Sequence, residues 1–102
     1  KIVGVKHKGG EEFVLPQGRI FQNESIIKGA ERKSLEETGF SAQITNLIEI
    51  RKVIFRFKST ILERWFFIFN SNIEGGKPIP KDKEDIEEVE FLTKVPMKSD
   101  FY

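Results

Sequence analysis

The pattern of apolar and polar residues predicts short extended segments on either side of one helix. Over residues 1–6, Ile2 and Gly4 alternate with Val3 and Val5, glycines occupy positions 9 and 10, and extended character resumes over residues 12–15. Alternation interrupted by a glycine turn is typical of a β-hairpin. The chain is therefore expected to open with a hairpin that leads into the charged region after Pro16.

A helical pattern follows over residues 23–38. Either Asn23 or Ser25 can cap the first exposed amides, and Gly39 suits a left-handed stop at the other end. Apolar and small residues recur along one stripe, as expected of an amphipathic helix. We expect a helix of about four turns.

The polar side of this helix carries a dense cluster of charges. Residues three and four apart are neighbours on a helix, so Lys33 is expected beside both Glu36 and Glu37. Gln17 and Gly18 end the preceding strand-like run, which places a tight loop against the start of the helix. A strand-loop-helix junction with carboxylates nearby can hold a metal ion or a phosphate.

Further strands are expected after the helix, at residues 41–50, 53–58, 61–69 and 89–92. The apolar run that ends at Phe69 indicates a central strand buried on both faces. Glycines and prolines at residues 75–80 predict a loop, which continues through a charged stretch. Strands around one helix indicate a single α+β domain over residues 1–102.

Composition narrows the classes of partner. The net charge is +1, which gives no general attraction to DNA or to membranes, and no apolar run reaches the length of a membrane span. The chain has no cysteine, which fits a reducing, cytoplasmic compartment, and a single histidine, His7, which argues against a zinc cluster. Basic residues in the 51–58 segment, among them Arg51 and Arg56, either form a solvated face or line a phosphate site.

The segment 18–40 resembles the Nudix box, which has glycine, five residues, glutamate, seven residues and then R-E-U-x-E-E-x-G-U, where U is aliphatic or aromatic. The flanking segments also look like the strands of that family, so the resemblance covers nearly the whole chain. The residues that match the fixed positions are Gly18, Glu24, Arg32, Glu36, Glu37, Gly39 and Phe40.

The resemblance implies an α/β/α sandwich with a mixed β-sheet, and a hydrolase of nucleoside diphosphates linked to another moiety. In similar proteins the box glutamates bind Mg²⁺ or Mn²⁺, so Glu36 and Glu37 are the expected ligands. The carbonyl of Gln17 or Gly18 would add an oxygen, as hard cations require several. The expected partner is a small nucleotide.

The resemblance also assigns supporting residues. Glu24 and Arg32 would pair to hold the loop against the helix. Glu87 or Glu88 would act as a metal ligand or general base, alongside Glu37, or would simply belong to a solubilising acidic loop.

Two positions depart from the family pattern, and the one at Ser34, where the family has an aliphatic residue, affects only packing. Lys33 stands where the family has glutamate, so the site loses a ligand and gains a positive charge. Lys33 would neutralise Glu37 or contact a substrate phosphate. The alternative function is therefore a catalytically weak or inactive domain that binds nucleotides or regulates.

Similar chains carry another strand before the first hairpin, and here that strand is expected to be missing. An uncovered sheet edge must be paired, covered or blunted in a folded protein. Formation of a homodimer is one remedy.

Overall fold

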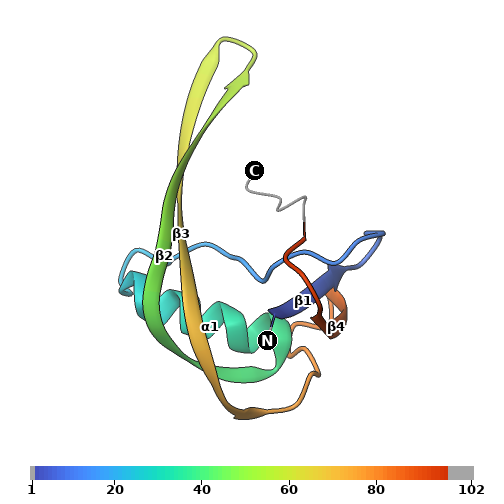
Figure 1. Cartoon of the computed structure of the whole chain (residues 1–102). Coiled ribbons are helices and arrows are strands. Elements are labelled where there is room, and N and C mark those ends of the chain that lie inside the picture. Colours follow the sequence, from blue (N-terminus) through green and yellow to red (C-terminus); the bar gives the residue numbers. More distant parts are fainter. Residues whose placement is uncertain (1, 97–102) are drawn as a thin grey trace.

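The computed structural model describes residues 2–96 and contains four strands and one helix in this part of the chain. The described elements are β1 (Ile2–His7), α1 (Ile26–Thr38), β2 (Phe40–Phe57), β3 (Thr60–Gly76) and β4 (Ile86–Leu92). The strands form two antiparallel pairs, β1 with β4 and β2 with β3 (Figure 1). The α+β class of the Nudix fold is confirmed.

The helix α1 begins and ends as the sequence predicts. Ser25 is the residue that caps it, because its hydroxyl accepts a hydrogen bond from the Lys28 amide across 3.1 Å. Gly39 ends it in the left-handed conformation, with φ of 81°, and donates its N–H to the carbonyl of Leu35. A side chain at position 39 would also collide with the backbone of Ile79. Glycine is therefore required both for the left-handed conformation and for this close approach.

The long hairpin β2–β3 projects beyond the rest of the molecule (Figure 1). The segments 41–50 and 53–58, predicted as separate strands, are one strand in the structure. Three register shifts near its beginning, between residues 41 and 49, absorb the irregular part of the pattern. Lys58 adopts a positive φ of 58° in the connecting turn.

The pair β1–β4 forms the small buried core. Val5 is opposite Val89 in the ladder, and both backbone hydrogen bonds between Val5 and Val14 measure 2.8 Å. Val5, Val14 and Ile86 pack together at this point. The second strand of the predicted first hairpin is thus a single bridge, and Pro16, which has no N–H, follows it closely.

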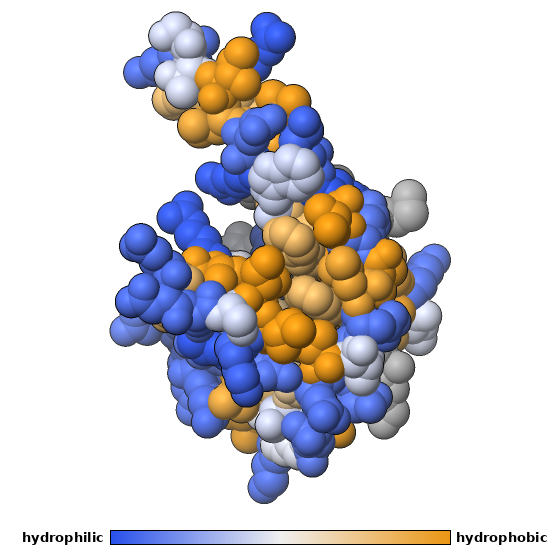
Figure 2. Space-filling view, turned by 90° about the vertical axis from the view of Figure 1, so that its left-hand side faces the viewer, coloured by the Kyte–Doolittle hydropathy of each residue, from blue (hydrophilic) through white to orange (hydrophobic). Residues whose placement is uncertain are grey.

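The prediction of a buried central strand at residues 61–69 is wrong. Ile61 is 62% exposed and Trp65 is 56% exposed, because β3 pairs with β2 alone among the described strands. Figure 2 shows apolar residues on the projecting arm and in a broad patch below it. The apolar run therefore predicts a strand correctly. It does not predict burial, which would require a second neighbouring strand that is not found among the described residues.

The helix α1 connects the two sheets. It packs mainly against β2 and also contacts β1 and β4. Its buried positions are Gly29, Glu37 and Thr38, so the end of the helix, with its carboxylate, lies deepest in the fold. This arrangement brings one acidic residue of the 18–40 segment next to β1 and the start of β4.

Candidate functional site

Glu37 is the centre of the candidate site. It is 2% exposed, and no other acidic or basic side chain of residues 2–96 is buried. Its Oε1 accepts a hydrogen bond from the backbone N–H of Gln17 across 3.1 Å. The loop residue Gln17 is thereby joined to the last turn of the helix, and not to its start, where the sequence analysis placed the loop.

The electrostatic surroundings of Glu37 compete with one another. Burial raises the pKa of its carboxyl above the ordinary value of 4.5, because desolvation disfavours the charged form. The hydrogen bond from Gln17 and the charge of Lys33 act in the opposite direction, and burial outweighs them. A carboxylate with a raised pKa holds protons more readily, which suits a general base.

Lys33 lies beside both glutamates, as predicted from helical spacing. Its Nζ is 3.5 Å from Oε1 of Glu36 and 3.7 Å from Oε2 of Glu37. Gly18 packs directly against the methylene stem of Lys33, where a Cβ would overlap the side chain. The loop residue and the lysine therefore fix each other's position.

The predicted ion pair between Glu24 and Arg32 is present and extensively bonded. The shortest contact, from Nη2 of Arg32 to Oε1 of Glu24, measures 2.8 Å, and Arg32 also donates to the carbonyl of Arg19. The Arg32 guanidinium lies 3.8 Å from the ring centre of Phe21. Hydrogen bonds from Arg32 and from the Phe21 amide lower the pKa of Glu24.

Arg32 also contacts Glu36, one turn further along the helix. Its Nη1 is 3.1 Å from Oε2 of Glu36, so both oxygens of Glu36 face a cation. The Glu36 side chain is 39% exposed, unlike that of Glu37, which is 3% exposed. The two box glutamates thus differ in burial and in their neighbours.

Two residues that the sequence analysis did not select lie next to Glu37. Ligand atoms of His7, Glu37 and Asp85 all lie within 4.8 Å of one another. Nδ1 of His7 and Oδ2 of Asp85 are 3.1 Å apart. The three residues come from β1, from α1 and from the segment just before β4.

The acidic segment that leads into β4 pairs with Lys6 through Glu87 and Glu88, which lie in the strand itself. Nζ of Lys6 is 3.2 Å from Oε1 of Glu88 and 3.6 Å from Oε2 of Glu87, so both predicted carboxylates form ion pairs with that lysine. The carboxylate that this segment brings to Glu37 is instead Asp85. Glu87 and Glu88 are not in the group of potential metal ligands found among the described residues.

A large cavity lies between α1 and the hairpin. Its volume is about 1160 Å³, and its wall includes Gln17, Gly18 and Lys33 on one side and Arg51 and Trp65 on the other. The cavity thus meets the candidate site at residues that contact Glu37. Arg51 is held by both oxygens of Glu49, each 3.1 Å away.

Arg56, the other arginine predicted to bind substrate, is exposed on the projecting part of β2. It is absent from the cavity wall within the described part of the chain. The basic residues of this segment are thus divided, with Arg51 at the cavity and Arg56 away from it.

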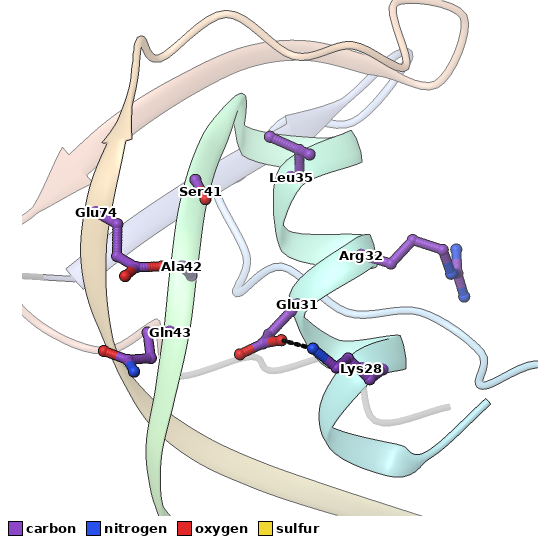
Figure 3. Close-up of a pocket in the computed structure, with 8 residues that line it drawn as sticks. All are labelled: Lys28, Glu31, Arg32, Leu35, Ser41, Ala42, Gln43 and Glu74. Atoms are coloured by element: carbon purple, nitrogen blue, oxygen red, sulfur yellow. Dashed lines mark ion pairs between the residues drawn. The ribbon is translucent and has the colours of Figure 1, made fainter.

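A second hollow, of about 430 Å³, lies where α1 faces the beginning of β2 (Figure 3). Figure 3 shows that the Arg32 guanidinium points away from it. Glu31 pairs there with Lys28 at 3.9 Å and accepts a hydrogen bond from the Ile44 amide. Glu31 is engaged in structural contacts, and the other acidic residue of the wall, Glu74, lies outside the 18–40 segment, so this hollow is the poorer candidate for the site.

The comparison with known families agrees with this geometry. The family model of the NUDIX domain matches residues 2–96. The chain belongs to the Nudix hydrolase family. No curated protein matches the chain, and no helix among residues 2–96 of this Nudix chain is long and apolar enough to cross a membrane.

The donor set fits the divalent cation that Nudix proteins generally use. Two carboxylates and one imidazole meet at the site, and carboxylate oxygens suit Mg²⁺ and Mn²⁺. Sequence reasoning missed His7 and Asp85 because neither belongs to the box. The sequence does show that His7 ends an expected strand and that Asp85 precedes another. It does not show that these two strands pair, because strand pairing cannot be deduced from spacing.

Proposed function

We propose that this chain is a metal-dependent hydrolase of nucleoside diphosphates linked to another moiety. The observation that carries the proposal is the buried carboxylate of Glu37, which contacts two residues of a large cavity wall, Gln17 and Lys33. A small nucleotide is the proposed partner. The family supports hydrolysis as the reaction class.

The proposed cation is Mg²⁺ or Mn²⁺, held by Glu37 with Glu36 and a backbone carbonyl of Gln17 or Gly18. When bound, such a cation polarises a phosphoryl oxygen and lowers the pKa of a bound water. Glu37 is proposed as the general base, because burial raises its pKa. Glu87 and Glu88, which pair with Lys6, would need to leave that lysine to take part.

Other residues would bind substrate or support the site. Lys33 and Arg51 line the same cavity, so they are the proposed contacts for substrate phosphates. Arg56 would reach substrate only from outside the cavity. Glu24 and Arg32 are proposed to hold the loop against α1 and so to maintain the hydrogen bond between Gln17 and Glu37.

The second candidate function is a nucleotide-binding or regulatory domain with little turnover. The observation that favours it is the contact of Lys33 with both Glu36 and Glu37. An ammonium group there competes with a cation for the same oxygens. Phosphate binding would survive this competition better than catalysis, because Lys33 can itself contact a phosphate.

A phosphate-release assay over a panel of nucleotide substrates, with and without Mg²⁺ or Mn²⁺, tests the first proposal. Glu37→Gln keeps the side-chain shape and removes the base, so it should abolish release. Glu90→Gln, on the exposed part of β4, is the matched control and should keep it. Nucleotide binding without metal-dependent release in the wild type would favour the second function.

A further inference from the structure

His7 offers the candidate site a nitrogen ligand that the box does not contain. Its Nδ1 is 3.1 Å from Oδ2 of Asp85. A cation about 2.0–2.2 Å from both atoms would see them at an angle of about 90–100°, which suits adjacent ligands in octahedral geometry. Glu37 would supply a further oxygen, since its ligand atom lies within 4.8 Å of the other two.

The backbone holds these three residues together without a metal. The amides of Lys81 and Asp82 donate to the carbonyl of Glu36, at 3.0 and 2.9 Å, which ties the segment carrying Asp85 to the helix next to Glu37. The amide of Lys8 donates to the carbonyl of Asp85 across 2.8 Å, which ties the same segment to the end of β1. The backbone therefore holds the segments that carry these three side chains next to one another.

The charges also favour a cation at this point. The ligand atoms of Glu37 and Asp85 lie within 4.8 Å of each other, and a cation between them would offset the repulsion between the two carboxylates. Lys33 already meets one oxygen of Glu37, at 3.7 Å, but it approaches from the side of the cavity wall. His7 and Asp85 come from the segments at β1 and before β4.

We propose that His7, Glu37 and Asp85 form a three-residue cation site, and that the imidazole of His7 makes this site prefer Mn²⁺ to Mg²⁺. The proposal rests on the proposed metal-dependent function and names residues outside the box for it. Imidazole nitrogen suits transition cations, whereas Mg²⁺ favours oxygen ligands and retains its waters. His7 and Asp85 thus replace the ligand that Lys33 removes from the box.

Direct titration of the metal-free protein with Mn²⁺ and with Mg²⁺ tests the site. His7→Gln should weaken Mn²⁺ binding at least tenfold and Mg²⁺ binding less than threefold. Asp85→Asn should weaken both. Glu84→Gln, which removes the neighbouring exposed carboxylate, is the matched control and should bind both cations as the wild type does.

A measurement on the wild type makes the test independent of how the variants fold. His7 is the sole histidine of the sequence, so its imidazole proton signals are unambiguous in an NMR spectrum. Substoichiometric Mn²⁺ should broaden those signals before those of other side chains. Absence of this broadening, or equal Mn²⁺ affinity in His7→Gln and wild type, would overturn the proposal.

Measuring Mn²⁺ affinity and phosphate release on the same variants separates the His7 site from the proposed hydrolase function. Metal-dependent phosphate release that persists in His7→Gln, with unchanged Mn²⁺ affinity, would disprove the His7 site and leave the hydrolase intact. Mn²⁺ binding at His7 without phosphate release from any substrate would support the site and contradict the hydrolase.

Discussion

The ammonium group of Lys33 lies 3.7 Å from the buried carboxylate of Glu37. The contact joins a charge that the Nudix box does not contain to the carboxylate at the centre of the site. The same lysine also packs against Gly18, so it contributes both to the charge around Glu37 and to the position of the loop.

Replacing Lys33 by glutamate should tighten Mn²⁺ or Mg²⁺ binding at least tenfold, which corresponds to about 1.4 kcal/mol. The change removes a competing cation and adds an oxygen ligand. At roughly 4 Å and an effective dielectric near 20, one unit charge is worth about 4 kcal/mol before solvent and side-chain motion reduce it. Calorimetric titration of both proteins measures the effect.

Lys28→Glu is the matched control for this substitution. Lys28 lies on the same helix with its side chain 79% exposed, and it pairs with Glu31. The control makes the same change in net charge away from Glu37. Equal affinity gains in the two variants would show that overall charge, and not the position of Lys33, controls metal binding.

Gly18→Ala should destabilise the wild type and have little effect in a Lys33→Ala background. A Cβ at position 18 would overlap the stem of Lys33, and removing that stem frees the space. Thermal unfolding of the two single variants and the double variant forms a complete cycle. Strictly additive changes would mean that Gly18 is required for its backbone and not for this contact.

Arg32→Ala should lower the unfolding midpoint by at least about 5 °C, a large shift for a domain of this size. The substitution removes the bonds to Glu24 and Glu36 and the contact with Phe21. Lys28→Ala, on the same helix, should leave the midpoint nearly unchanged. Equal midpoints in Arg32→Ala and wild type would show that the ion pair is not structural.

The effect of Arg32→Ala should also depend on pH. The pKa of Glu24 is lowered in the folded state, so the pair stabilises the protein above the ordinary value of 4.5, and this stability is lost as pH falls through the lowered pKa. The difference between variant and wild type should shrink in that acidic range. A difference that is constant down to low pH would exclude the charged pair as its cause.

Glu37 should show the opposite dependence. Its folded pKa is raised, so the folded state keeps the proton longer, and stability declines as pH rises from 4.5 through the raised pKa. Glu37→Gln should remove this decline and raise the midpoint near neutral pH in metal-free buffer. Midpoints measured from pH 4 to 8 decide the matter, with Glu90→Gln expected to follow the wild type.

The exposed apolar residues of the hairpin predict self-association, and we propose that the homodimer expected from an uncovered sheet edge would bury them. Ile61 is 62% exposed and Ile54 is 55% exposed, and the net charge of +1 gives little repulsion between copies. Ile61→Lys should lower the association seen by sedimentation. Thr60→Lys adds the same charge one residue away and should lower it less; a monomer at all concentrations would contradict the prediction.

The local features of the site were predictable from sequence because they follow helical spacing. Ser25, Gly39 and the contacts of Lys33 with Glu36 and Glu37 depend on residues a few positions apart. Gly18 differs, because it packs against Lys33, which is distant along the chain, and only the family pattern placed this glycine in the loop before the helix. Short-range geometry thus accounts for most of what was predicted.

The parts that sequence could not supply depend on strand pairing. His7 and Asp85 meet because β1 pairs with β4, and the bulge between Lys6 and His7 changes the register at that point. The exposure of Ile61 likewise depends on which strands lie next to β3. Neither can be deduced from alternation within a single segment.

The three residues at the candidate cation site belong to the first strand, the helix and the last connecting segment. They come together in the folded chain and are far apart in an unfolded one. A cation held there would act as a cross-link between distant parts of the backbone, so its binding free energy would add to folding stability, by about 1.4 kcal/mol for each tenfold excess of free cation over Kd. The availability of metal would then set the fraction of chains that are folded, as well as the rate of any metal-dependent reaction.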